Sequence, residues 1–174
     1  MKKSAAKKLV ELSIITPDGQ FLARYSETGL VQLRFPPRRA AQLELPIAPA
    51  PVARWHRVTT AALKRALAGR VPKILPPLDL NDGTAFQQSV WRMLQKIPLG
   101  QTRSYGDLAK ALKNPRGYRA VGSACGANPI PVLIPCHRIL AHNRKLGGFS
   151  GGLEWKRKLL WREEVRDWWP AGAE

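Results

Sequence analysis

The chain of 174 residues is long enough to bury a substantial core, as one domain or as two small ones. A hydrophobic share of 44% and a charged share of 24% are typical of a folded protein and exclude a disordered or fibrous one. Its 29 Lys and Arg against 12 Asp and Glu give a net charge of +17, which indicates a polyanionic partner, although basic surfaces also occur on proteins that bind none.

No apolar stretch approaches the roughly 18 residues that a membrane helix needs, and the basic residues 1–8 lack the apolar run of a signal peptide. We therefore expect no membrane partner and a cytoplasmic protein, or a nuclear one if the cell is eukaryotic. Its two cysteines, Cys125 and Cys136, are too few for a disulfide framework and form no CxxC pair. No metal and no other cofactor are expected.

The amino-terminal part, residues 1–78, is predicted to form antiparallel strands and a helix. Leu9–Ile15 and Gly29–Phe35 are rich in β-branched residues or alternate in polarity, as strands do. Between them, Thr16–Gly19 has the composition of a tight turn. A hairpin pair or meander is therefore expected here.

Proline divides the next part of the chain. Residues 45–52, rich in proline and alanine, are predicted to form a surface loop. Apolar residues then recur at helical spacing from Trp55 to Leu67, which indicates an amphipathic helix that packs on the strands. A second proline-rich stretch, 71–83, has little periodicity, so we place a domain boundary there and a second domain over residues 79–174.

The second domain is predicted to be mostly helical. Thr84 and Gln87 form a capping box that starts one helix. A serine caps another helix over 104–113, and a third spans 118–127. The last two have the proportions of a helix-turn-helix, although most helical hairpins never touch DNA.

The helix over 118–127 is unusual because one side carries almost only small residues, namely Ala120, Gly122, Ser123, Ala124, Gly126 and Ala127. Glycine costs a helix roughly 1 kcal/mol per position relative to alanine, so the glycines indicate that something approaches closely. The sequence leaves open whether this is another helix or a nucleic-acid backbone.

The strongest chemical signal is Cys136 beside His137 and Arg138. Closely spaced prolines before it exclude a regular helix or a central strand and indicate a stiff, extended segment. A cysteine attacks as its thiolate, and a neighbouring base or cation favours that form. The alternative is a small buried cysteine beside a solvated histidine.

Two further features follow the cysteine segment. Residues 146–152 contain four glycines, which can bring backbone amides close to a planar ligand, although a plain surface loop fits equally well. The last helix begins near Leu153 and carries the chain to Glu163. The other thiol, Cys125, is expected to pack in the core or in a groove.

Between about residues 80 and 165, the chain resembles the O6-alkylguanine-DNA alkyltransferases. The resemblance rests on an ordered series of motifs with matching gaps. For residues 1–78 it extends only to length and coarse pattern. The motifs are Gly83-Thr84-x-Phe86-Gln87, Val90-Trp91, Ile97-Pro98-x-Gly100, Ser104-Tyr105-Gly106, Arg119-Ala120-Val121-Gly122, Asn128-Pro129, Pro135-Cys136-His137-Arg138 and Gly148-Phe149-Ser150-Gly151-Gly152.

The resemblance implies an α+β protein of two domains. These are an amino-terminal antiparallel sheet with a helix, similar to ribonuclease H, and a mostly helical winged helix-turn-helix domain that holds the active site. It also implies a monomer that flips O6-alkylguanine out of double-stranded DNA and transfers the alkyl group irreversibly to Cys136, once per molecule. O4-alkylthymine is left open as a second substrate.

The resemblance also assigns catalytic roles. In this family a glutamate orients a histidine, which deprotonates the cysteine through a water; here these are Glu163, His137 and Cys136. The roles suit the chemistry, since a neutral imidazole accepts a proton and a carboxylate fixes its tautomer. Tyr105 is implied to donate to the flipped base, and Asn128 to tie the second helix to the cysteine segment.

The implied DNA contacts lie mainly on the helix over 118–127, where Arg119 takes the place of the flipped nucleotide and small residues let the helix enter the minor groove. The contacts assigned are Arg119, Ala120, Ser123, Ala127 and Tyr105. The substrate pocket is assigned to Pro131, Phe149, Ser150 and Lys156. Phe149 stands where many relatives have tyrosine, which leaves the range of accepted alkyl groups open.

Three other functions are weighed against this one. A non-catalytic sensor of alkyl lesions would use the same fold, but such relatives typically lack the cysteine. A winged helix-turn-helix transcription factor needs long base-reading side chains, which the helix over 118–127 lacks. A Cys-His hydrolase would turn over repeatedly, and the sequence gives no sign of a polar substrate cleft.

Overall fold

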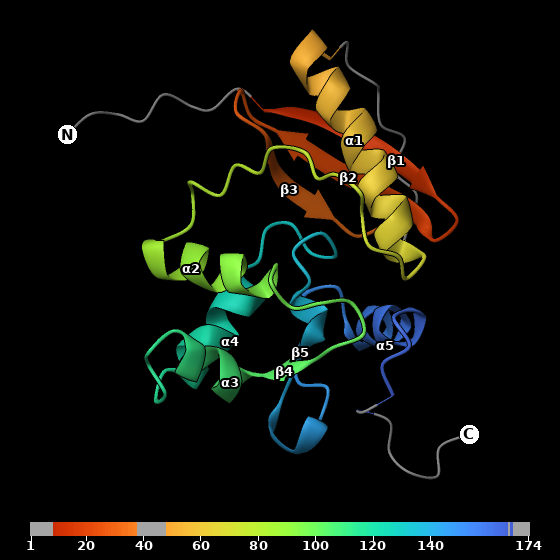
Figure 1. Cartoon of the computed structure of the whole chain (residues 1–174). Coiled ribbons are helices and arrows are strands. Elements are labelled where there is room, and N and C mark those ends of the chain that lie inside the picture. The colour runs from red at the N-terminus through yellow and green to blue at the C-terminus, as the bar shows by residue number, and fades with distance from the viewer. Residues whose placement is uncertain (1–8, 38–47, 167, 169–174) are drawn as a thin grey trace, which may run out of the picture.

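The computed structural model describes residues 9–37, 48–166 and 168, and it shows a mixed α+β fold (Figure 1). The sheet and helix α1 form one part, and the remaining helices gather beneath them in the view of Figure 1. The basic start of the chain, residues 1–8, lies outside the described residues, as do residues 45–47 of the predicted loop.

The sheet is an antiparallel meander in the order β1-β2-β3. The first and third strands lie where the sequence predicts them, the meander is one of the two predicted arrangements, and the turn between the first two strands is the predicted one. Alternate residues of β1 and β2 are buried, as are Leu30 and Leu33 of β3, which places one face of the sheet against the core. The strands are β1 (Val10–Thr16), β2 (Gly19–Tyr25) and β3 (Leu30–Arg34).

Helix α1 (Ala50–Leu67) lies across the sheet (Figure 1). It begins within the stretch that was predicted to be a loop, so that prediction is wrong for residues 50–52. The reason is Pro51, which lies in the first turn of the helix, where a missing N–H leaves no hydrogen bond unmade. The buried side of α1 consists of Val52, Thr59, Ala62, Leu63 and Leu67.

Within the described residues, the second part contains four α-helices and a two-stranded sheet. Capping boxes start two of the helices, Thr84 with Gln87 and Ser104 with Asp107, because each hydroxyl accepts a backbone N–H and each N3 side chain returns the bond. The elements are α2 (Ala85–Leu94), β4 (Arg103–Ser104), α3 (Tyr105–Ala111), α4 (Tyr118–Gly126), β5 (Ile139–Leu140) and α5 (Leu153–Arg162), with β4 parallel to β5.

The two parts share one hydrophobic core and are joined by polar contacts. Arg162, at the end of α5, donates to both carboxylate oxygens of Asp18 at 2.6 and 3.0 Å and to the Leu67 carbonyl at 2.8 Å. Hydrogen bonding from Arg162 is the largest influence that lowers the pKa of Asp18. On β3, the Leu33 N–H donates to the Pro129 carbonyl at 2.9 Å. The division at residues 78 and 79 stays a prediction, because the core is continuous across it.

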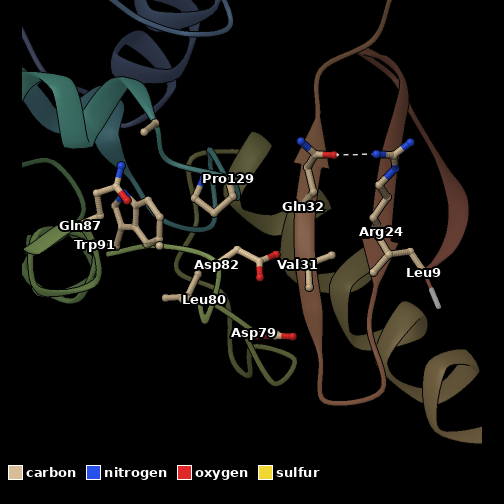
Figure 2. A pocket seen from close by; sticks show the side chains of 12 residues that line it. Leu9, Arg24, Val31, Gln32, Asp79, Leu80, Asp82, Gln87, Trp91 and Pro129 are labelled. Atoms are coloured by element: carbon tan, nitrogen blue, oxygen red, sulfur yellow. Dashed lines mark hydrogen bonds between the residues drawn. The ribbon is translucent and has the colours of Figure 1, made fainter. Parts of the chain in front are cut away.

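A cavity of about 310 Å³ lies between the sheet and α2 (Figure 2). Its polar side chains are already paired within the protein. Arg24 donates to Gln32 at 3.4 Å, and the Asp79 carboxylate accepts hydrogen bonds from Ser26 and Thr28 at 2.6 and 2.9 Å. The side chains of Arg24, Gln32 and Asp79 in this cavity therefore already have hydrogen-bond partners within the protein.

None of the helices in the described ranges combines the length and apolar character needed to cross a membrane.

Candidate active site

Cys136 lies in a rigid, buried segment of the second part. It opens the short 3₁₀ turn Cys136–Arg138, and its side chain is 5% exposed. Its own N–H donates to the Ile134 carbonyl at 2.8 Å. Val132 nearby has a φ of 74°, a value that is rare for a β-branched residue and typical of strained functional segments. The predicted extended conformation is wrong, because the chain turns at Val132 and Leu133, where the Ile134 N–H donates to the Ile130 carbonyl at 2.9 Å. The hydrogen-bonded turns fix the direction of the thiol.

The amide of Asn128 holds this segment to the end of α4. Its Nδ2 donates to the Ile134 carbonyl at 2.8 Å and to the Cys136 sulfur at 3.1 Å, and its Oδ1 accepts from the Ile130 N–H at 3.0 Å. Burial raises the pKa of the Cys136 thiol, and the Asn128 hydrogen bond opposes that rise in part. Cys136 is therefore a thiol at neutral pH that needs a base to become a nucleophile.

His137 and Glu163 form a buried pair. The His137 Nε2 lies 2.9 Å from the Glu163 Oε1, and the two side chains are 1% and 3% exposed. Burial lowers the pKa of His137, although the bond to Glu163 opposes this, so the imidazole is neutral near pH 7. A neutral ring that donates Nε2–H to the carboxylate leaves Nδ1 unprotonated, and Nδ1 has no hydrogen-bond partner among the described residues. Nδ1 is thus available as a base.

Arg138 completes this network from a third direction. Its Nε and Nη2 each donate to Glu163 at 2.9 Å, and its Nη1 donates to the Ile97 carbonyl at 2.6 Å. Burial raises the pKa of Glu163, but hydrogen bonds from His137 and Arg138 outweigh it and hold that pKa at about 2. From the sequence, Arg138 is expected only to supply positive charge beside the thiol. No sequence signal reveals its hydrogen bonds to Glu163, because only the fold brings α5 to the cysteine segment.

A cavity of about 280 Å³ opens onto Cys136. The structure brings to it the predicted residues Tyr105, Phe149 and Ser150. Burial raises the pKa of Tyr105, so its hydroxyl remains a donor at neutral pH. Pro131 is buried outside this lining, and so is Lys156. The lining is Tyr105, Gly122, Cys125, Cys136, Gly126, Gly148, Phe149 and Ser150.

Lys156 holds the glycine-rich loop from behind. Its ammonium group is fully buried and donates to the Ile139 carbonyl at 2.6 Å, to the Gly148 carbonyl at 3.3 Å and to the Leu146 carbonyl. Burial lowers the pKa of Lys156 to about 8. The side chain therefore shapes the cavity by fixing the loop that lines it.

Cys125 is the second thiol of this cavity. It is buried, as the sequence analysis expected, but it also forms part of the wall beside Cys136. Burial, and after it the negative charge of Cys136, raises the pKa of Cys125 to about 12. The periodicity of α4 was a usable signal, because Cys125 follows Gly122 by three positions and so lies on the same side of the helix.

The outer face of α4 is open and nearly without large side chains. Arg119, Ala120, Ser123 and Ala127 are exposed, whereas Val121, Ala124 and Cys125 point into the core. The Arg119 guanidinium lies 5.8 Å from the ring of Tyr118, which is also exposed and which the sequence analysis did not single out. The Trp91 indole N–H donates to the Ala124 carbonyl at 2.8 Å and fixes α4 on α2. This face can approach a narrow groove.

No metal ligand set accompanies these residues. Among the residues that the structure describes, no group of three or more His, Cys, Asp or Glu side chains is placed to hold a metal ion. The chemistry of the site is that of a buried thiol, an imidazole and a carboxylate, next to an open helix face.

Comparisons with known proteins show which family this chain resembles. Residues 85–165 match the family model described as 6-O-methylguanine DNA methyltransferase, DNA binding domain. Methylated-DNA–protein-cysteine methyltransferases of Methanosarcina acetivorans and Methanosarcina barkeri are 37% and 38% identical over 145 and 154 residues, which cover 83% and 87% of this chain and 92% and 94% of theirs. The Haemophilus influenzae relative is 54% identical over 84 residues, 48% of this chain and about half of its own length (47%).

Solved structures are similar over nearly the whole chain. The O6-methylguanine methyltransferase of Mycobacterium tuberculosis is 33% identical with a TM-score of 0.72, and the match covers 94% of this chain and 96% of that one. The structure of the M. tuberculosis protein in complex with DNA is also 33% identical, with a TM-score of 0.67 over 89% of this chain and 94% of that one. The overall mixed α+β fold is therefore one that solved structures also have.

Proposed function

Because the chain belongs to the methylated-DNA–protein-cysteine methyltransferase family, we propose that it repairs DNA by transferring the alkyl group of O6-alkylguanine to Cys136. The observation that carries this proposal is the cavity whose wall holds the Cys136 thiol, next to a buried and neutral His137 that Glu163 orients. Burial disfavours the thiolate of Cys136, and an adjacent base that removes the thiol proton makes the sulfur a nucleophile for an alkyl carbon.

The reaction we propose is an in-line displacement. His137 takes the proton of Cys136 through a water, and the thiolate attacks the alkyl carbon. The sulfur–carbon bond forms as the carbon–O6 bond breaks, and the electron pair of the broken bond passes to O6. Protonation of the resulting anion gives unmodified guanine. Negative charge develops on O6, and the Tyr105 hydroxyl and the Ser150 amide are the donors that we assign to it. A thioether is stable, so each molecule reacts once.

We propose that the partner is double-stranded DNA with an alkylated base, and that a monomer of this chain binds it. The protein would then act in the cytoplasm, or in the nucleus of a eukaryotic cell. We assign α3 and α4 to a helix-turn-helix whose second helix enters the minor groove. Support comes from the small exposed residues of α4 and from the net charge of +17. On this assignment residues 1–78 form a supporting domain, and residues 79–174 carry DNA binding and chemistry.

The proposal is tested by incubating the protein with duplex DNA that bears O6-methylguanine. We expect the mass of the protein to rise by one methyl group, and peptide mapping to place that group on Cys136. Duplex DNA with unmodified guanine serves as the control and should leave the mass unchanged. Repeated turnover would contradict the proposal, and lesion binding without an adduct would indicate a damage sensor instead.

Replacing Arg119 with alanine should slow repair of the duplex by about tenfold and leave reaction with the free base O6-benzylguanine within about twofold of wild type. The reason is that flipping costs a few kcal/mol, which an inserted guanidinium offsets, whereas a free base needs no flipping. Single-turnover rates on both substrates provide the measurement. Arg57→Ala, which removes an exposed charge from α1, is the matched control. Equal losses on both substrates would rule out the flipping role.

A further inference from the structure

One side chain of the amino-terminal part reaches the wall of the Cys136 cavity. Phe35 follows β3 directly, and its ring centroid lies 5.6 Å from that of Phe149, with an interplanar angle of 71°. Phe149 lines the cavity, and its own ring lies 6.3 Å from that of His137, nearly perpendicular to it at 85°. Phe35 therefore touches the reaction site through a single intermediate.

The ring of Phe35 is held on several sides. Phe21, which is 1% exposed on β2, lies 5.6 Å from it, and Trp155 of α5 lies 4.9 Å from it, all as distances between ring centroids. Phe21 and Trp155 also pack against each other in an edge-on contact at 5.5 Å. The end of β3 is fixed by the hydrogen bond from Leu33 to Pro129. The ring thus has little freedom to move away from the loop.

The glycine-rich loop is shaped to fit this ring. A Cβ atom placed on Gly151 would lie 2.4 Å from the Phe35 Cε2 and 2.7 Å from its Cδ2, well inside contact distance. Gly151 lies within a tight turn in which the Gly152 N–H donates to the Phe149 carbonyl at 3.0 Å. This hydrogen bond closes the turn around Ser150 and Gly151 and links both to Phe149. A ring that fixes Gly151 also fixes the two residues that line the cavity.

The loop is consequently held from two sides by different means. Lys156 holds the carbonyls at its start, Leu146 and Gly148, whereas Phe35 packs against its later residues. Lys156 belongs to the second part of the chain, but Phe35 belongs to the first. Without Phe35, Phe149 and Gly151 lose an aromatic neighbour that covers them.

We propose that Phe35 is a positioning residue for alkyl transfer, and that through it the amino-terminal sheet sets the shape of the alkyl pocket. Phe35 touches neither Cys136 nor the substrate in this proposal. It acts through Phe149 and through the Ser150 amide, which the loop presents to the departing oxygen. The proposal rests on the function proposed above, and it gives residues 1–78 a role in the chemistry.

The first test replaces Phe35 with alanine and with leucine. We expect the single-turnover rate with O6-methylguanine in duplex DNA to fall about tenfold in F35A, because shifting a donor costs less than the ~10² that its removal costs. F35L should recover part of the rate by restoring apolar volume. Affinity for the duplex, measured by fluorescence anisotropy, should stay within about twofold of wild type, since the α4 face is unchanged.

Trp55→Ala is the matched control, because Trp55 is a half-buried aromatic residue of the amino-terminal part that lines a different cavity. It should destabilise the protein without changing the rate. In a single-turnover reaction the amplitude reports the folded fraction, whereas the rate constant reports the geometry of the pocket. A loss of amplitude alone in F35A would show that Phe35 is merely structural and would overturn the proposal.

The second test is a double-mutant cycle with Gly151→Ala. In the single variant G151A, the added methyl group collides with the Phe35 ring, which should slow alkyl transfer about tenfold. In the F35A background the collision is gone, so the double variant should be no slower than F35A itself. Independent effects would instead multiply to about a hundredfold loss. Multiplicative losses would contradict a coupling between Phe35 and the loop.

Hydrogen exchange separates failure of this proposal from failure of the proposed function. Amide protection over residues 146–152 should fall in F35A and stay unchanged in W55A, whether or not alkyl transfer occurs. A wild-type protein that forms no adduct would refute the function alone. If the wild type is active and F35A has the same rate and the same loop protection, the positioning role alone is refuted.

Discussion

Replacing Cys136 with alanine is expected to abolish alkyl transfer completely, whereas Cys125→Ala should still acquire one methyl group on Cys136. Both thiols line the same cavity, so proximity to the substrate does not distinguish them. Burial raises the pKa of both thiols, that of Cys125 to about 12, so neither attacks without activation, and the groups around each sulfur distinguish them. Only Cys136 has both the Asn128 hydrogen bond and an adjacent, oriented imidazole.

Intact mass and peptide mapping after incubation with O6-methylguanine duplex provide the measurement. C136A should still bind the duplex with an affinity within about twofold of wild type, because the α4 face does not include Cys136. This binding shows that the variant is folded. A methyl group found on Cys125 in C136A would contradict the assignment of the acceptor.

Exchanging Glu163 for glutamine should slow alkyl transfer by about 10³-fold and destabilise the protein by about 3 kcal/mol. A glutamine can present its amide N–H to His137 Nε2, which favours the wrong tautomer and removes the charge that stabilises the imidazolium. The same exchange leaves the partly buried Arg138 without its carboxylate, and breaking a buried ion pair costs several kcal/mol. Both losses follow from one residue because Glu163 bonds to both neighbours.

The pH dependence of stability gives an independent measure of this carboxylate. Its pKa is about 2 in the folded protein against an ordinary value of 4.5, so its contribution is fully present above about pH 4.5 and is lost as pH falls toward 2. Urea unfolding at pH 7, 4.5 and 3 should therefore show a smaller acid loss for E163Q than for wild type.

Glu164→Gln is the control for both measurements, since Glu164 is exposed and adjacent in sequence. Its rate and stability should match those of wild type. An E163Q protein that transfers methyl groups at the wild-type rate would show that His137 does not depend on Glu163. Equal effects of E163Q and E164Q would point to net charge instead.

Local features of the fold were predictable because they depend on residues that are close in sequence. The capping boxes at Thr84 and Ser104 need only a partner three positions on, and both are present. The lack of a regular helix or a central strand in residues 129–135 follows from proline geometry. The start of α1 was missed for a related reason: proline excludes the interior of a helix but suits its first turn, and residues 50–52 alone do not show which applies.

Neighbouring Cys136 and His137, and the bare face of α4, were also evident from the sequence, and the resemblance added Glu163 and Asn128. The structure brings Asn128 to the sulfur and Glu163 to the imidazole. It does not bring Pro131 or Lys156 to the cavity lining. Instead, it gives Lys156 a place behind the loop, because its ammonium group finds three carbonyl acceptors there.

The sequence by itself determined the chemistry available to this protein: a thiol beside an imidazole, on a stiff segment that follows a helix of small residues. Only the tertiary structure decided which distant side chains contact these groups. Arg138 donates hydrogen bonds to Glu163, which lies 25 positions further along the chain, and Phe35 packs against Phe149, more than a hundred residues away in sequence. The pKa values of Cys136, His137 and Glu163 depend on burial and on such distant partners. Periodicity and spacing report only the neighbours within a few residues, so they leave these contacts undetermined.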